Sequence, residues 1–169
     1  NVVQHSNLGG IPPWGGGGFN GGGGVLIRNG AVGNEVNCFI GFSAGDGVVL
    51  SNCGSAQRPN RVWDCTIAPN GGIGIRLEAG AHHNIIDRNR IDAEQDAGPG
   101  FPCATTGIVI TGAGTSHNMI TFNRIKNALG TGILVADSAN SNIIDSTLVS
   151  NSGQDGIVID NSDNTSLLT

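Results

Sequence analysis

Tyrosine, lysine and long apolar runs are almost absent from this sequence of 169 residues. It contains no Tyr, one Met, two Trp and five Phe, and Lys126 is its single lysine. Its eight basic residues are spread thinly through a chain of net charge −5. Phosphate binding requires a clustered basic footprint, so we expect no nucleic-acid partner. No segment of about 18 consecutive apolar residues occurs, which leaves no candidate for a membrane span.

Metal-binding and cofactor motifs are also missing. None of the four cysteines belongs to a CxxC pair, so a zinc site is not expected. The calcium-binding nonapeptide GGxGxDxUx has one near-match, GGIGIRLEA at residues 71–79, and Arg76 stands there at the position that requires aspartate. We therefore expect neither a metal nor an organic cofactor.

The first residue and the cysteine count indicate an extracellular protein. The chain begins at Asn1 without an initiator methionine or a signal peptide, as expected for a mature secreted chain or for a piece of a longer one. Four cysteines, an even number, suit an oxidising compartment and allow three disulfide pairings. The sequence thus predicts a secreted or cell-surface location.

Glycine and asparagine are abundant instead, with 29 and 19 residues respectively. High glycine content often signals disorder. Here β-branched apolar residues recur periodically, and they can bury enough surface to offset the entropy of ordering the chain. Length and pattern together predict a single domain over residues 1–169.

The periodicity comes from a repeat of about 24 residues that carries three landmarks. The first is a glycine that leads a short apolar strand, at Gly24, Gly47, Gly72, Gly107, Gly132 and Gly156. The second is Asn-x-apolar, 10 to 13 residues later, at Asn37, Asn60, Asn84, Asn118 and Asn142. The third follows five residues further on, at Phe42, Cys65, Asn89, Asn123 and Thr147.

Each repeat holds three short strands with alternating apolar residues, and none of them can bury a face alone. Stacked as coils they can, because each strand pairs in parallel with its equivalents about 4.8 Å above and below. The sequence therefore predicts an all-β fold, a single-stranded parallel β-helix (β-solenoid) of about six coils. In the central repeat Ile108, Ile110, Ile120 and Ile125 point inward, and the asparagines of the second landmark form a structural ladder.

The repeat unit reads N-x-I-x-x-N-x-I, as in residues 118–125, together with G-I-x-I, as in residues 107–110. Over residues 24–164 this pattern resembles the right-handed parallel β-helix repeat family, the pectate-lyase-like β-solenoids. The resemblance implies a right-handed coil. It implies no particular activity, since lyases, epimerases, adhesins, phage spikes and structural proteins share such coils.

Two segments interrupt the repeat. Residues 9–23 are expected to form a Gly/Pro-rich loop, in which Trp14 and Phe19 could anchor the chain against the coil. Residues 92–106 are expected to form an acidic inserted loop, and such loops often carry the binding function of repeat scaffolds.

The alignment of the repeats also indicates which cysteines could form disulfides. Cys65 occupies the third landmark one coil before the inserted loop, which carries Cys103. Cys38 and Cys53 lie in neighbouring coils. This placement favours the disulfides Cys38–Cys53 and Cys65–Cys103 over the other two pairings.

Phasing on the second landmark sets His83 beside His117 in adjacent coils, with Asp87 and Arg124 on the same outward face. A cation, imidazoles and a carboxylate on one face could bind an acidic polysaccharide. They could also abstract the proton next to a uronate carboxylate. Alternatively, these residues are polar only because outward positions of a solenoid face water. The sequence shows neither the clustered carboxylates of calcium-dependent lyases nor a DPHE-type epimerase motif, which favours a protein without catalytic activity.

The positions two residues after each glycine of the first landmark form one outward row. Gly74 occupies this position in the third coil, and the other five positions are apolar: Leu26, Val49, Val109, Leu134 and Val158. A continuous apolar stripe on a protein surface usually marks a contacted area. We therefore expect these five residues to form a binding surface.

Two functions are compatible with these features. The first is a non-catalytic extracellular structural or surface β-solenoid, whose unpaired parallel edges could add further copies end to end into a filament. The second is a carbohydrate-active β-helix, either a polysaccharide lyase, an epimerase or a glycan-binding module. The expected partner is accordingly another copy of the chain or an acidic polysaccharide.

Overall fold

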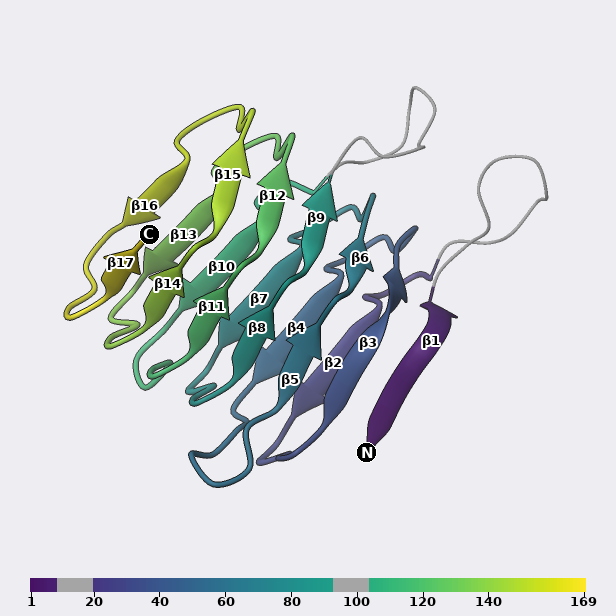
Figure 1. Cartoon of the computed structure of the whole chain (residues 1–169), viewed down its shortest axis with the longest axis horizontal. Helices are drawn as coiled ribbons and strands as arrows, with labels where there is room; N and C mark the ends of the chain where they lie inside the picture. Colours follow the sequence, from purple (N-terminus) through teal and green to yellow (C-terminus); the bar gives the residue numbers. More distant parts are fainter. Residues whose placement is uncertain (9–19, 93–103) are drawn as a thin grey trace.

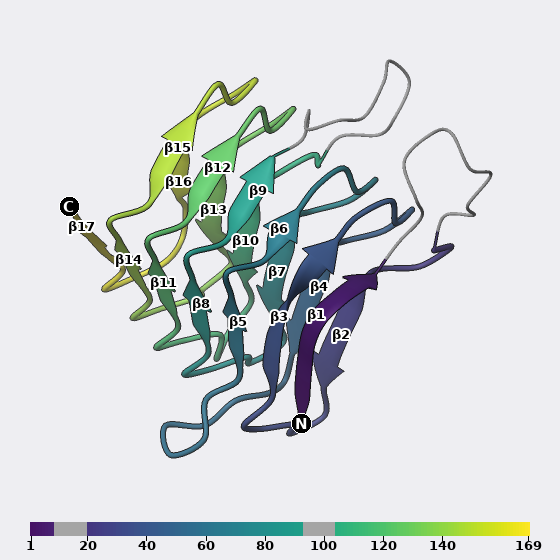
Figure 2. The same ribbon diagram turned by 45° about the vertical axis from the view of Figure 1, so that its right-hand side comes forward.

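The computed structural model describes residues 1–8, 20–92 and 104–169. These residues contain seventeen strands and no helix. Every pairing between the strands is parallel. Figures 1 and 2 show the strands stacked as successive coils, with the two ends of the chain at opposite ends of the stack. The predicted all-β parallel solenoid is confirmed.

The coil wall consists of two sheets. The larger has eleven strands in the order β15-β12-β9-β6-β3-β5-β8-β11-β14-β17, with β1 paired to β3. Its strands are β1 (Val2–Leu8), β3 (Glu35–Ile40), β5 (Arg61–Trp63), β6 (Thr66–Ile67), β8 (Ile85–Asp87), β9 (Arg90–Asp92), β11 (Met119–Thr121), β12 (Arg124–Lys126), β14 (Ile143–Asp145), β15 (Leu148–Ser150) and β17 (Ser166–Leu168).

The smaller sheet has six strands in the order β16-β13-β10-β7-β4-β2. They are β2 (Val25–Arg28), β4 (Val48–Ser51), β7 (Ile75–Glu78), β10 (Ile108–Thr111), β13 (Ile133–Ala136) and β16 (Ile157–Ile159). From the first to the last of these six equivalent strands the chain makes five turns, slightly fewer than the six coils predicted.

A repeated bend divides each coil of the larger sheet into two halves. Strand β3 pairs with β5 through its first residues and with β6 through its last. In the later coils two residues separate the two short strands, and the first of them has positive φ, at Asp64 (48°), Arg88 (52°), Phe122 (53°) and Ser146 (47°). Because the same left-handed conformation recurs at the same place, all the coils bend together and stay in register.

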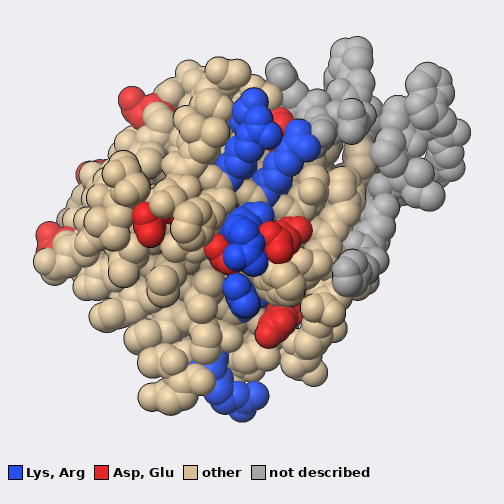
Figure 3. Space-filling view, viewed as in Figure 1, with Lys and Arg blue, Asp and Glu red and all other residues tan. Residues whose placement is uncertain are grey.

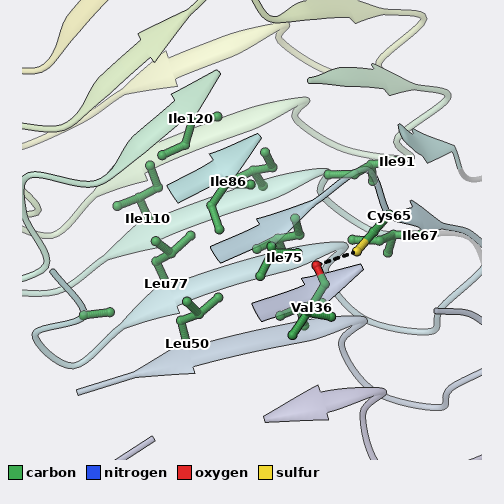
Figure 4. Close-up of a cluster of buried hydrophobic side chains, with 14 of the residues drawn as sticks. Val36, Leu50, Cys65, Ile67, Ile75, Leu77, Ile86, Ile91, Ile110 and Ile120 are labelled. Atoms are coloured by element: carbon green, nitrogen blue, oxygen red, sulfur yellow. Dashed lines mark hydrogen bonds between the residues drawn. The ribbon is translucent and has the colours of Figure 1, made fainter. Parts of the chain in front are cut away.

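Stacked aliphatic side chains fill the interior of the coil (Figure 4). Ile108, Ile110, Ile120 and Ile125 are fully buried, as the inward pattern of the central repeat predicted. Burying one such side chain contributes about 1.5–3 kcal/mol relative to leaving it exposed. The stack therefore supplies the main favourable free energy of folding, and it leaves the outward side chains free for other roles.

The leading glycines allow the two sheets to approach closely. A Cβ atom on Gly107 would lie 2.6 Å from the carbonyl oxygen of Gly132 and would also collide with Ile125. In the third coil this place belongs to Gly74, whose Cβ would lie 2.5 Å from the oxygen of Gly107. The predicted position Gly72 is therefore wrong by two residues.

The asparagine ladder lies at the corner before the larger sheet. The Nδ2 atoms of Asn60, Asn84 and Asn118 each donate to Oδ1 of the next asparagine, at 3.0, 3.1 and 3.0 Å, and the series ends at Asn142. All four side chains are buried. These bonds fix the height of each coil relative to the next, because a buried amide is costly to leave unpaired.

The ladder residue of the preceding coil is Asn34, which corrects the prediction of Asn37. Asn34 Nδ2 donates to Asn60 Oδ1 at 2.8 Å. Asn37 instead lies within β3, and its Nδ2 donates to the carbonyl oxygen of Trp63 at 3.1 Å. Both residues begin an Asn-x-apolar sequence, so the local pattern is satisfied by either.

The cysteines do not form the predicted bridges. Cys38, Cys53 and Cys65 are buried free thiols, which excludes Cys38–Cys53 and Cys65–Cys103 in this structure; Cys103 itself lies outside the described residues. The reason is their placement on the coil. Cys38 lies opposite Cys65, as the register of the following residues shows, whereas Cys53 follows β4 of the other sheet.

The predicted outward apolar row is interrupted. Strand register aligns Leu26 with Val49, and Val109 with Leu134 and then Val158. Between Val49 and Val109, however, it places Arg76 instead of Gly74. The Arg76 Nε lies 2.8 Å from Asp46 Oδ2, and Val109 is buried. A charged residue and a buried valine thus break the continuous exposed stripe.

The two predicted loops lie largely outside the described residues. Trp14 and Phe19 of the 9–23 segment are among the residues without a description, as are residues 93–103 of the 92–106 segment. At the described end of the first segment, Asn20 forms a parallel bridge with Ser43 of the next coil.

Candidate functional site

The outer surface of the larger sheet carries a cluster of basic residues that we call the basic strip. It consists of Arg61 on β5, Arg88 between β8 and β9, Arg90 on β9, and Arg124 and Lys126 on β12. These are five of the eight basic residues of the chain. Figure 3 shows basic side chains gathered in a band across this face, with acidic side chains beside them. Scattered in the sequence, these charges converge because the coils stack.

Asp87 is the acidic centre of the basic strip. Its carboxylate lies 2.8 Å from Arg88 Nη1 and 3.2 Å from Arg61 Nη2, and it accepts a hydrogen bond of 3.0 Å from Thr121 Oγ1. The Asp87 side chain is only 8% exposed. A nearly buried carboxylate with three partners on three coils is held rigidly, and it fixes two guanidinium groups on the outer surface.

Arg88 also bridges to Asp64 of the previous coil, with Nε 3.0 Å from Oδ1. The hydrogen bonds that it donates to Asp64, followed by the charge of Asp87, raise the pKa of the Arg88 guanidinium. This arginine remains cationic at every physiological pH. Because the Arg88–Asp64 pair is half exposed, solvent screens the two charges and the pair contributes little to stability.

The other end of the basic strip has an excess of positive charge. Arg90 Nη2 lies 3.4 Å from Asp92 Oδ2, and in strand register Arg124 lies opposite Arg90 and Lys126 opposite Asp92. Within the described part of the chain, neither Arg124 nor Lys126 forms an ion pair. Two like charges on neighbouring strands repel each other, so a bound anion would stabilise this end.

Aromatic and apolar side chains flank the cations. The guanidinium carbon of Arg61 lies 5.2 Å from the ring centroid of Trp63, a cation–π contact. Phe122 at the bend is 60% exposed, and Leu148 on β15 and Met119 on β11 are exposed as well. The face therefore combines charged groups with flat apolar groups.

Several donors of this face have no partner. The Nε atoms of Arg61 and Arg90 and the Nε1 atom of Trp63 are buried and make no hydrogen bond to the described residues. Buried donors of this kind are rare in folded proteins, and an unsatisfied one usually has a reason.

The predicted histidines lie at a different place on the coil. The rings of His83 and His117 are parallel, 4.9 Å apart between centroids and inclined by 4°. Both residues occupy the left-handed region at the corner before β8 and β11, with φ of 56° and 55°. Beside them, Nδ1 of His82 lies 3.0 Å from Nδ1 of His83. Burial, then the neighbouring charges of His117 and His82, lower the pKa of His83.

The four residues of the predicted site therefore form two groups. His83 lies at the corner two residues before β8, and Asp87 is the last residue of that strand. Asp87 belongs to the basic strip, at the other end of β8. The structure thus brings His83 to His117, and Asp87 to Arg61 and Arg88, without uniting the imidazoles and the cations in one site.

Sequence reasoning did not single out Arg61 or Trp63. The register pairs Arg61 with Ile85 and Trp63 with Asp87. A comparison of the residues that follow each ladder asparagine, RVW in one coil and IID in the next, would have placed Trp63 beside Asp87. This alignment signal was present in the sequence, but residues 61–63 considered alone resemble an ordinary strand.

Stacked parallel strands, a repeated corner ladder and an aliphatic core define a parallel β-solenoid with charged side chains on its outer face. The family model described as right handed beta helix region matches residues 18–168, and the chain belongs to this family. Comparison with the curated proteins and with the solved structures gave no match.

Two further findings concern ligands and membranes. In the described ranges no three His, Cys, Asp or Glu side chains are grouped so that they could hold a metal ion. The same residues include no helix with the length and apolar character needed to cross a membrane.

Proposed function

We propose that this chain is a non-catalytic extracellular β-solenoid that binds an acidic polysaccharide on the outer face of its larger sheet. The observation that carries the proposal is the basic strip, in which Arg124 and Lys126 have no ion pair within the described residues. The chain as a whole is acidic, with a net charge of −5. Local positive charge on an acidic protein favours a specific anionic ligand over general attraction to polyanions.

The repeat of the coils suits a repeating ligand. Neighbouring coils are about 4.8 Å apart, close to the length of one pyranose unit in an extended polysaccharide. Arg90 and Arg124 occupy equivalent places in successive coils. Each guanidinium can bind a carboxylate through two parallel hydrogen bonds. A polyuronate running along the stack could thus place one carboxylate at each arginine.

The apolar groups of the face support a sugar ligand over a simple anion. Trp63 and Phe122 present aromatic rings beside the cations, and the apolar faces of pyranose rings can pack against such rings. The unpartnered donors of Arg61, Arg90 and Trp63 could find acceptors after small side-chain movements around a bound polyol.

The separation of the histidines from the cations supports binding without catalysis. Abstraction of a proton next to a uronate carboxylate requires a base within hydrogen-bond reach of that proton and a cation at the carboxylate. His83 and His117 lie at the corner before β8 and β11, and the ion pairs of the basic strip are made with Asp64, Asp87 and Asp92. Incubation with polyuronates, followed by ultraviolet detection of unsaturated products, tests the lyase alternative; product formation would overturn the non-catalytic proposal.

Calorimetric titration with polygalacturonate and with a neutral polysaccharide such as amylose tests binding. We expect binding of the polyuronate only, weakened by added salt because the contacts are ionic. Arg124→Gln should weaken it by about tenfold, which corresponds to about 1.4 kcal/mol. Arg28→Gln is the matched control, since Arg28 is an exposed arginine on β2 of the other sheet. Equal effects of the two substitutions, or equal binding of amylose, would contradict the proposal.

A second candidate, self-association end to end, is favoured by a separate observation. A cavity of about 300 Å³ opens at the outermost coil that holds β1, β2 and β3, lined in part by Val25, Ile27 and Val36. At the opposite end of the stack, Leu167 and Leu168 on β17 are each about half exposed. Parallel edges with apolar side chains can add a strand from another copy.

Sedimentation velocity over a wide concentration range tests this candidate for the 169-residue chain. If copies stack end to end, the sedimentation coefficient rises continuously with concentration, and Leu167→Asp shifts the distribution towards the monomer. A single monomeric species at every concentration would exclude assembly. Polysaccharide binding by Arg124 would be unaffected by that result.

The proposed extracellular location follows from the same ligand class, because acidic polysaccharides are components of cell surfaces and matrices. Protease treatment of intact cells that produce the chain provides the test. Degradation is expected for a surface protein, and full protection would contradict this location.

A further inference from the structure

The second corner of the coil carries a ladder that changes its chemistry at the first coils. Asn89 N donates to Asn123 Oδ1 at 2.9 Å, and Cys65 N donates to Asn89 Oδ1 at 3.0 Å. The next step is Cys38 N to Cys65 Sγ at 3.5 Å. Two thiols therefore occupy successive places of a ladder that holds amides at Asn89 and Asn123 and a hydroxyl at Thr147.

Cys38 and Cys65 lie directly opposite each other. Phe39 pairs with Thr66 and Ile40 with Ile67. Cys38 N donates to Cys65 Sγ as Cys65 N donates to Asn89 Oδ1, so the two cysteines occupy equivalent places in neighbouring coils. Neighbouring parallel strands are about 4.8 Å apart. Disulfides join residues whose Cα atoms are about 4.4–6.8 Å apart, so the two cysteines are placed for a bond with little backbone movement.

We propose that Cys38 and Cys65 are a redox-active pair that a small peroxide converts into a disulfide between two neighbouring coils. Both side chains are buried in the aliphatic core, at 6% and 1% exposure, which excludes bulky oxidants. Hydrogen peroxide is close to water in size. Figure 4 shows Cys65 among the core side chains, with its hydrogen bond to the carbonyl oxygen of Val36.

The electrostatics assign the two sulfurs different roles. The hydrogen bond from the Cys65 thiol lowers the pKa of Cys38. The same hydrogen bond, followed by burial, raises the pKa of Cys65. Cys38 is accordingly the sulfur that ionises first and reacts as a thiolate. No second thiol contributes to the pKa of Cys53, and burial raises that pKa to about 11.

The reaction balances in two steps. The Cys38 thiolate attacks one oxygen of hydrogen peroxide, the O–O bond breaks, and hydroxide leaves and takes up a proton, which gives a sulfenic acid at Cys38. The Cys65 sulfur then attacks the Cys38 sulfur. The S–O bond breaks, the S–S bond forms, and water leaves with the proton of Cys65. Two thiols are oxidised by two electrons and one peroxide is reduced to two waters.

The test treats the folded chain with hydrogen peroxide, alkylates the remaining thiols after denaturation, and maps the peptides by mass spectrometry. Trypsin leaves Cys38 and Cys53 in one peptide. Cleavage before aspartate separates all the cysteines, since Asp46 lies between Cys38 and Cys53 and Asp64 between Cys53 and Cys65. We expect a linked pair of the Cys38 and Cys65 peptides that has lost two hydrogens and that dithiothreitol separates. The thermal midpoint should rise on oxidation and return on reduction.

Two variants sharpen this experiment. Cys53→Ala keeps the pair and should form the same linked peptides, whereas Cys65→Ala should leave Cys38 unlinked. If Cys65→Ala fails to fold, the peptide maps of the unaltered chain and of Cys53→Ala still show whether Cys38 and Cys65 become linked. A link from Cys38 to Cys53 or from Cys65 to Cys103, irreversible oxidation of Cys38 without a link, or four unmodified thiols would each overturn the proposal.

Discussion

The side-chain amide of Asn84 donates to Oδ1 of Asn118 at 3.1 Å, and the main-chain N–H of Asn84 donates to the same oxygen at 3.0 Å. Both side chains are inaccessible to solvent. One oxygen thus holds both the backbone and the side chain of the neighbouring coil. The stability of the stacked coils depends on this arrangement and on the close packing of the neighbouring glycines.

Asn118→Ala should lower the free energy of unfolding by about 2–4 kcal/mol. The substitution removes the acceptor of Asn84 and the donor to Ala81 O and Asn142 Oδ1, and each buried group left unpaired costs about 1–3 kcal/mol. Urea denaturation followed by circular dichroism measures the loss. Asn1→Ala is the matched control, because Asn1 makes the equivalent bond to Asn34 at an exposed position. If both variants lose the same stability, the buried ladder has no special role.

Gly107→Ala should destabilise the fold by about 1–3 kcal/mol, the usual cost of overpacking. The new methyl group would lie 2.6 Å from the carbonyl oxygen of Gly132, which the stacked coils hold in place. Gly21→Ala adds the same methyl group where no atom lies within 4 Å. Thermal unfolding of the two variants should show a lowered midpoint for Gly107→Ala alone. An unchanged midpoint for this variant would mean that the coils can separate without cost.

Asp87→Asn should lower the stability of the fold and raise its affinity for a polyuronate. The neutral amide weakens the contacts of Asp87 with Arg61 and Arg88, so the free energy of unfolding should fall. The same change leaves two guanidinium groups without their counter-charge, so polygalacturonate should bind several-fold more tightly at low salt. Titration calorimetry and urea denaturation measure the two quantities. Weaker polyuronate binding by a folded Asp87→Asn would show that Asp87 itself contributes to the ligand site.

Stability should decrease as the pH falls below neutrality. Burial and the neighbouring imidazoles lower the pKa of His83 below its ordinary value of 6.5. The unfolded chain therefore takes up a proton at a higher pH than the folded chain. Stability is fully present above pH 6.5 and is lost as the pH falls from there towards the lowered pKa of the folded state.

The test of this pH effect is His83→Asn, because asparagine tolerates the left-handed conformation that His83 adopts. Urea denaturation at pH 7 and at pH 5 should show a smaller difference in unfolding free energy for His83→Asn than for the unaltered chain. An identical pH dependence would assign the effect to other groups.

Much of the fold was predictable because a repeat restricts the possible alignments. The segments HNIIDRNRI at 83–91 and HNMITFNRI at 117–125 have the same spacing, so the sequence alone aligned His83 with His117 and Arg90 with Arg124. The family resemblance added the right-handed coil, and the family match agrees with it. The alignment could not show that His83 lies at the corner before β8 while Asp87 lies at the end of that strand.

The sequence by itself determined the coil, its inward isoleucines and most of its ladder, because alternation and spacing are properties of the chain alone. Only the tertiary structure decided between Asn34 and Asn37, between Gly72 and Gly74, and between the possible partners of Cys38. Each alternative satisfies the same local pattern. The choice depends on which amide, carbonyl oxygen or sulfur lies one coil away, and that is fixed when the coils stack.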